Sequence, residues 1–138
     1  MGQIHHSVAT LRFFSDDLAP EEISGLLGSQ ATESWKKGDE RIGKSTGAVR
    51  IAKTGMWRFS ATRREPEDLD AQVFEILEQL NQDLDVWAKL SARYKPDLYC
   101  GIFMGNSNDG LPITSKALFW LGARGINLNL DIYDALDD

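Results

Sequence analysis

Residues 126–133 are Ile-Asn-Leu-Asn-Leu-Asp-Ile-Tyr, a strict alternation of apolar and polar side chains. Successive side chains of a β-strand point to opposite faces of a sheet, so the segment is predicted to be a strand with one face in the core and the other in water. We expect its core face to be formed by Ile126, Leu128, Leu130 and Ile132. Strands of a doubly wound parallel sheet are apolar on both faces, so the alternation favours a mostly antiparallel sheet.

Composition and turn residues place the other strands upstream of this one. Four more segments have the composition of strands, at 8–14, 48–52, 56–63 and 97–105. The second and third are separated only by a tight Lys-Thr-Gly turn and are predicted to pair as a hairpin. Residues 29–47 are polar and punctuated by glycine, so we expect a long ordered loop there.

Helices are predicted in three parts of the chain. One spans 20–27, and another runs to about residue 123 from a cap at Thr114 or Ser115; each is followed closely by a glycine. Between 66 and 94, apolar residues recur at three- and four-residue spacing. A single helix of that length would measure ~40 Å. We therefore expect a break near 81–83, where Asp83 can cap a second helix.

The resulting order β-α-β-β-α-α-β-α-β predicts one α+β domain over residues 1–138, with a mostly antiparallel five-stranded sheet and helices packed on one face. The chain has 42% hydrophobic and 26% charged residues, which is ordinary for a globular domain. No apolar run reaches the ~18 residues of a membrane span. Residues 1–10 lack the pattern of a secretory signal. We therefore expect a cytoplasmic protein without a membrane partner.

Charge is distributed unevenly along the chain. Residues 36–64 carry nine Lys or Arg and two acids, a net charge of +7, whereas residues 1–35 carry −4 and residues 65–138 carry −9. The basic segment could recognise an anionic ligand or an acidic partner. It could equally be neutralised by the acidic segments, with its charges discouraging edge-to-edge pairing of strands. The overall acidity and the lack of a recognised fold signature argue against nucleic-acid binding.

Several short motifs together resemble those of a bacterial family, domain of unknown function 4279. They follow one another in order over nearly the whole chain, at residues 9–14, 20–23, 26–28, 35–39, 54–57 and 128–133. The resemblance implies a single domain and supplies no catalytic residue. One departure is Asn129, where the family pattern leads us to expect an acidic residue. That departure weakens the hypothesis of a paired-carboxylate site on the last strand.

Residues 38–45, Gly-Asp-Glu-Arg-Ile-Gly-Lys-Ser, match the letters of the phosphate-binding loop G-x-x-x-x-G-K-[ST]. A true phosphate-binding loop follows a buried strand and opens a helix, whose N-terminus faces the anion. Here residues 33–37 are polar, and residues 46–51 are predicted to form a turn and then a strand. We therefore expect no nucleotide site at residues 38–45.

The remaining reactive side chains are few. The single cysteine, Cys100, lies in an apolar run and is expected to be a buried, unreactive thiol. His5 and His6 are adjacent, so on a strand they point to opposite faces and cannot bind one metal together. Asp16 and Asp17 are explained as turn residues. We expect no metal and no cofactor.

The polar face of the sheet is the strongest candidate for a binding site. Arg guanidinium and Asn amide groups suit an anionic or peptide-like ligand. These side chains would converge if their strands are neighbours, although a plain solvated face explains them equally well. The candidate residues are Arg12, Trp35, Trp57, Arg58, Asn127, Asn129, Asp131 and Tyr133.

The sequence is compatible with three functions. The preferred hypothesis is a non-enzymatic module that binds a protein partner, with an accessory or immunity-type role beside a bacterial toxin. The second is a sensor of a small anionic ligand near Arg12, Arg58 and Trp57. The third is an uncharacterised hydrolase that uses Asp16, Asp17 or a histidine. A homo-oligomer is compatible with the wide apolar arc that Phe119 and its neighbours give to the last helix.

Overall fold

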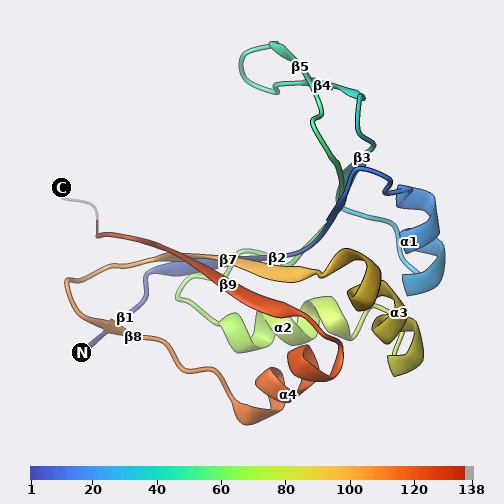
Figure 1. Cartoon of the computed structure of the whole chain (residues 1–138). Coiled ribbons are helices and arrows are strands. Elements are labelled where there is room, and N and C mark those ends of the chain that lie inside the picture. Colours follow the sequence, from blue (N-terminus) through green and yellow to red (C-terminus); the bar gives the residue numbers. More distant parts are fainter. Residues whose placement is uncertain (136–138) are drawn as a thin grey trace.

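The structure is a computed structural model that describes residues 1–135. It contains four helices and a five-stranded sheet, with two small two-stranded pairings beside it (Figure 1). The strands are β1 (Gly2–Gln3), β2 (His6–Ser15), β3 (Glu33–Trp35), β4 (Glu40–Ile42), β5 (Val49–Ile51), β6 (Gly55–Ser60), β7 (Asp97–Phe103), β8 (Asp109–Gly110) and β9 (Asn127–Tyr133). The helices are α1 (Pro20–Leu27), α2 (Leu69–Leu77), α3 (Leu84–Tyr94) and α4 (Ser115–Ala123).

The predicted α+β class is confirmed, and the main sheet is mixed. Its strand order is β3-β6-β2-β7-β9. The first three pairs are antiparallel, whereas β7 and β9 are parallel. They are parallel because α4 carries the chain back across the sheet before β9 begins. Alternation in β9 could not reveal this, since any strand with one uncovered face alternates, whatever the direction of its neighbour.

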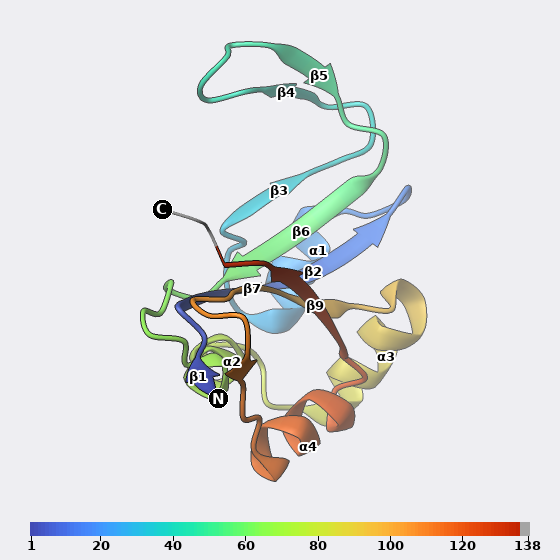
Figure 2. The same ribbon diagram turned by 90° about the vertical axis from the view of Figure 1, so that its left-hand side faces the viewer.

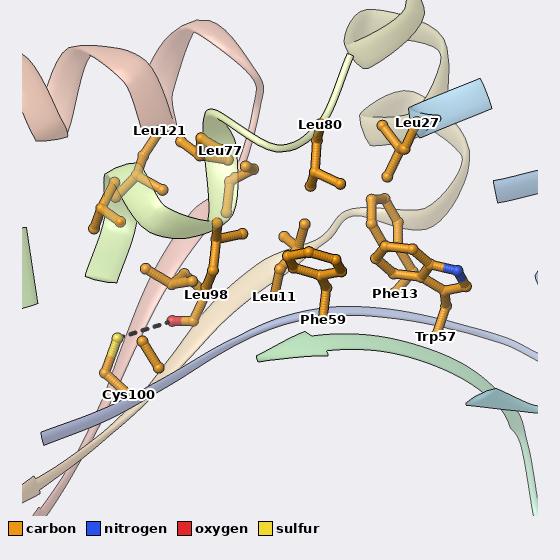
Figure 3. Packing of buried hydrophobic residues seen from close by; sticks show 14 of the residues in the cluster. Leu11, Phe13, Leu27, Trp57, Phe59, Leu77, Leu80, Leu98, Cys100 and Leu121 are labelled. Carbon is orange, nitrogen blue, oxygen red and sulfur yellow. Dashed lines mark hydrogen bonds between the residues drawn. The ribbon is translucent and has the colours of Figure 1, made fainter. Parts of the chain in front are cut away.

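The helices cover one face of the sheet, and the core lies between the two layers (Figures 1 and 3). Aromatic rings fill its centre, where Phe13 of β2 meets Trp57 of β6 edge-to-face at a centroid separation of 5.7 Å. The largest wholly buried aliphatic side chains around them are Leu11, Ile23, Leu27, Leu69, Ile76, Leu77 and Leu98.

The helix boundaries follow the signals in the sequence. Asp83 accepts a hydrogen bond from the backbone N–H of Asp85 and begins α3, which confirms the predicted break between α2 and α3. Thr114 caps α4 through the N–H of Ala117. Gly28 ends α1 in the left-handed conformation, with φ of 76°. Capping is a local interaction, so local sequence was sufficient to predict it.

The predicted hairpin of 48–52 with 56–63 is wrong. β5 pairs with β4, and β6 instead pairs with β2 and β3. Two of these partners, β3 and β4, lie inside the segment that was expected to be a loop. Both are three-residue strands, too short for period-two alternation to be recognised. Residues 36–54, which we call the arm, thus form a β4–β5 hairpin that projects from the sheet (Figure 2).

The expectation that all four apolar residues of the segment 126–132 anchor the core is partly wrong. Ile126 is buried and Leu128 packs partly against the core, but Leu130 and Ile132 are 38% and 60% exposed. β9 is the outermost strand, and its second half runs beyond the helix layer (Figure 1). Alternation therefore predicted the direction of these side chains correctly, but it could not predict where the covering layer ends.

Candidate functional site

The sheet face opposite the helices gathers polar and aromatic side chains into rows that cross the strands. One row runs directly across all five strands in register, through Glu33, Arg58, Arg12, Asp97 and Asn127. Arg12, Arg58 and the polar residues of β9 thus lie on one face of the sheet. This is the arrangement that a shared binding site on these strands requires. β7 lies between β2 and β9 and adds its own side chains to the face.

Further rows lie on either side of the charged row. The next one holds Ser60, Thr10, Tyr99 and Asn129, and Thr10 and Ser60 share a hydrogen bond of 3.0 Å. Beyond it come Asp131 and then a row of three rings, His6, Phe103 and Tyr133. On the opposite side lie Trp35, Met56 and Phe14. We call this set of rows the open face.

Both arginines of the charged row are paired with carboxylates of neighbouring strands. Arg12 donates two hydrogen bonds to Asp97, from Nε to Oδ1 at 2.8 Å and from Nη2 to Oδ2 at 2.7 Å. The hydrogen bonds that Arg12 donates to Asp97 raise the pKa of Arg12. Its guanidinium also lies over the Phe14 and Tyr99 rings, at 4.8 and 4.4 Å from their centroids. Arg12 is therefore fixed on every side by neighbours on the sheet.

Arg58 is held in the same way at the β3 edge. It donates to Glu33, which also accepts from Arg41 of the arm at 3.2 Å. Burial alone would raise the pKa of Glu33, but the hydrogen bonds from Arg58 and Arg41 outweigh burial and lower it. Trp35 lies on the open face beneath these charges, with the Arg41 guanidinium 3.6 Å from its ring centroid.

Asp131 is the centre of a second polar cluster. Its Oδ2 accepts hydrogen bonds from the phenol groups of Tyr99 and Tyr133, the latter at 2.6 Å. The bonds from Tyr133 and Tyr99 lower the pKa of Asp131, and the bond to Asp131 raises the pKa of Tyr99. An ionised acceptor makes these bonds stronger than neutral ones, so the two rings are held in place.

The far end of the open face is aromatic. Phe103 stacks on His6 at 4.1 Å between ring centroids and on Tyr133 at 4.5 Å, with the planes within 9° and 5° of parallel. Beside this stack lies a cavity of about 440 Å³, which is also lined by His5 and Met104. Burial and the nearby charge of Arg63 lower the pKa of His6. The cavity is therefore bordered by the rings of this stack, with Asp134 as an acidic group in its lining.

Trp57 does not belong to the candidate site. Its side chain is wholly buried on the helix side of the sheet, where its indole N–H donates to Ser24 Oγ at 3.0 Å (Figure 3). It neighbours Arg58 in sequence, and period two therefore places the two side chains on opposite faces. Sequence reasoning missed Glu33, Asp97, Tyr99 and Phe103. Only Asp97 and Tyr99 carried a signal, as polar residues alternating with apolar ones in 97–100.

The other reactive groups are scattered. Residues 38–45 form β4 and part of the turn of the arm, and the next element is the strand β5, where a phosphate-binding loop would begin a helix. Burial raises the pKa of the Cys100 thiol to about 12. Asp16 and Asp17 follow the end of β2, whereas His6 begins it, and ten residues of strand separate them by about 30 Å. Within residues 1–135, no three His, Cys, Asp or Glu side chains are grouped so that they could hold a metal ion.

Comparison with known proteins identifies the family. The model of the family described as "Domain of unknown function (DUF4279)" matches residues 3–135, nearly the whole chain. The chain belongs to this family. The match confirms the resemblance seen in the short motifs, and the DUF4279 description assigns no activity to any residue of the open face. No curated protein and no solved structure matches the chain. In the described part of the chain, no helix is long and apolar enough to cross a membrane.

Proposed function

We propose that this DUF4279 domain is a cytoplasmic, non-enzymatic bacterial module that recognises a protein partner through the open face. The observation that supports this most is the combination of aromatic rings with arginines that are already charge-paired. Tyr, Trp and Arg are the residues enriched at the energetic centres of protein interfaces. The rings of Tyr99 and Tyr133 are fixed by Asp131, so a partner meets a preorganised surface and little side-chain entropy is lost.

The alternative of an anionic-ligand sensor receives less support from the geometry. Arg12 and Arg58 already bind Asp97 and Glu33, and an incoming anion would have to displace these carboxylates. Trp57, the third residue expected near such a ligand, points into the core. A thermal-shift screen with small anions tests the sensor directly. A shift that disappears in Arg58→Ala would favour it over protein binding.

The hydrolase alternative also receives little support. Asp16 pairs with Lys37 at 3.3 Å, and Asp17 bonds to Ser15 and lies near Arg93. These contacts are those of exposed turn residues. With the histidines at the opposite end of β2, the carboxylates and the imidazoles cannot act together on one bond.

Site-specific photo-crosslinking in the native host tests the proposed function. A benzophenone amino acid replaces Ser60 or Asn129, which are exposed on the open face, and Ala88 or Lys89, which are exposed on α3, as matched controls. We expect one protein to be captured from both open-face positions and from neither control position. Capture must also be lost when Tyr99→Ser and Tyr133→Ser are introduced into the same chain.

Equal capture from α3 would contradict the proposal, and so would capture that survives the tyrosine substitutions. Mass spectrometry of the captured band then identifies the partner. An accessory or immunity-type role predicts that this partner is a bacterial toxin. A band at twice the mass of the chain from Ser60, which lies on β6 and is separated from the β9 edge by β2 and β7, would show self-association at the open face and would also contradict recognition of a different protein.

A further inference from the structure

The arm has one apolar face and one basic face. In the β4–β5 pairing, Ile42 lies opposite Val49 and Arg41 lies opposite Arg50. Opposite residues share a face, so Ile42, Val49 and Ile51 lie on one side, with Glu40 opposite Ile51, and the two arginines lie on the other. The three aliphatic side chains are 70%, 58% and 57% exposed. A row of β-branched residues in contact with water is a surface that is usually covered in the functional state.

The arm also has little to stabilise it within its own chain. A two-stranded hairpin alone is marginally stable in water, and like charges directly opposite each other destabilise it further. Arg41 stacks on Trp35 and pairs with Glu33. Arg50 forms no ion pair with any residue of 1–135. The apolar face and Arg50 therefore both lack partners within the described chain.

The opposite edge of the sheet offers a surface of matching chemistry. β9 is an edge strand of seven residues, and it contains no proline or lysine, which natural edge strands use to prevent pairing. Leu130 and Ile132 on its helix side are exposed. An unprotected edge that keeps exposed apolar side chains is a site at which another strand can add to the sheet.

Period two makes the two surfaces fit each other. If β5 pairs with β9 so that Val49 and Ile51 join Leu130 and Ile132 on one side, then Arg50 must lie on the other side, beside Asn129 and Asp131. The overall charges also match. The arm carries six Lys or Arg and two acids, a net charge of +4, in a chain of net charge −6, so the rest of the chain carries −10.

The two surfaces of one chain cannot meet each other. The arm leaves the sheet between β3 and β6, and β9 is the edge farthest from them in the strand order (Figure 2). A second copy, in contrast, presents both surfaces. We propose that β5 of one copy pairs with the outer edge of β9 in a second copy, and that a reciprocal exchange of arms closes a two-fold dimer. The pairing uses the outer edge of β9 and adjoins the open face only at Asn129 and Asp131. The inference does not depend on the proposed function.

Sedimentation velocity of the full chain, from micromolar to near-millimolar concentration, tests the exchange. We expect a reversible dimer for the wild type. Val49→Asp in the arm and Ile132→Asp in β9 should each give a monomer, because each breaks both symmetry-related contacts. Phe119→Asp is the matched control, since Phe119 is an exposed apolar residue of α4 outside both surfaces, and this variant should remain a dimer.

Mixing the two monomeric variants separates arm exchange from other modes of association. The intact arm of the Ile132→Asp copy can still pair with the intact β9 of the Val49→Asp copy, so we expect a weaker heterodimer. Pairing of arm with arm would leave the Ile132→Asp variant a dimer, and pairing of β9 with β9 would leave the Val49→Asp variant a dimer; either result would overturn the proposal. A wild-type monomer at every concentration would also overturn it, as would a dimer that only Phe119→Asp dissociates.

A covalent trap keeps the test independent of the folding of the aspartate variants. The Arg50→Cys, Asn129→Cys double variant leaves the apolar sides of both strands intact. Cys100 is buried and its raised pKa keeps it unreactive, so it can remain. With a mild oxidant we expect a dimer that a reductant separates, and neither single-cysteine variant should form it to the same extent. Equal cross-linking in the single variants would contradict the pairing of β5 with β9.

Discussion

At the scale of single residues, Arg12 shows how the open face is organised. Its guanidinium contacts a carboxylate of β7 and two aromatic rings, and its own side chain is only 22% exposed. The charge is therefore part of the sheet's internal structure and is not free to attract a ligand. A partner would therefore contact mainly the aromatic rings of this surface, because its charged groups already have partners within the sheet.

The Arg12–Asp97 pair should contribute measurably to stability. In Asp97→Asn, the half-buried guanidinium loses its charged acceptor, and we expect the free energy of unfolding to fall by about 1–3 kcal/mol. Urea titration measures the change. Asp16→Asn is the control, because Asp16 and its partner Lys37 are both well exposed, and it should leave stability nearly unchanged. Equal effects of the two substitutions would contradict the special role of Arg12.

Protonation of Asp131 should lower the stability of the domain at acidic pH. Its hydrogen bonds from Tyr133 and Tyr99 exist only in the folded state and lower its pKa there, below the unfolded value of about 3.9. A lowered folded-state pKa gives stability that is present above the unfolded pKa and is lost as the pH falls through the folded one. We expect the free energy of unfolding to drop below about pH 4, and to drop less in Asp131→Asn.

Urea titrations at several pH values measure this difference. Glu33 and Glu75 also have lowered pKa values, so Asp131→Asn should reduce the acid sensitivity without abolishing it. An unchanged pH dependence in Asp131→Asn would show that its bonds to the tyrosines do not persist in solution.

At the scale of elements, the arm stands apart from the rest of the fold. The helices and the five-stranded sheet share one core, whereas the aliphatic side chains of β4 and β5 lie outside it. The arm meets the sheet chiefly through Arg41 on Trp35 and through the Trp35 indole N–H, which donates to the Thr54 carbonyl at 3.1 Å. An element attached so lightly serves association better than it serves folding of the monomer.

Removal of the arm should therefore leave the domain folded. Trp35 lies opposite Met56, so residues 37–54 can be replaced by a two-residue Asn-Gly turn that joins β3 to β6. We expect cooperative thermal unfolding and a nearly unchanged circular dichroism spectrum, together with loss of the dimer. Loss of cooperative unfolding would show instead that the arm is part of the folding unit.

At the scale of the whole molecule, the fold separates the arm from the open face, although the arm lies between strands of the open face in the sequence. The basic segment of residues 36–64 is divided between the arm, β6, where Arg58 faces a carboxylate of β3, and residues 61–64, where Arg63 and Arg64 pair with Glu65 and Glu75. Part of its charge is thus neutralised within the chain, as one of the two interpretations expected. The part on the arm projects away from the acidic remainder, which leaves it available to a partner.

Features that depend on near neighbours along the chain could be predicted from the amino-acid sequence. The alternation in 126–133 correctly predicted which way each side chain of β9 points. Asp83 and Thr114 marked the starts of α3 and α4, because a cap bonds to a backbone N–H only two or three residues away. Together with the family motifs, these signals were sufficient to predict the α+β class.

The pairing of the strands and the extent of the helix layer could be read only from the three-dimensional arrangement. The partners of β6 lie 25 and 50 residues away along the chain, as the pairs Glu33–Arg58 and Thr10–Ser60 show, and no local pattern specifies them. The exposure of Leu130 and Ile132 likewise depends on where α4 stops covering β9. Side-chain direction is a property of the local backbone, whereas pairing and burial depend on segments distant in sequence. The rows of the open face and the unpaired edge of β9 follow from that second kind of information.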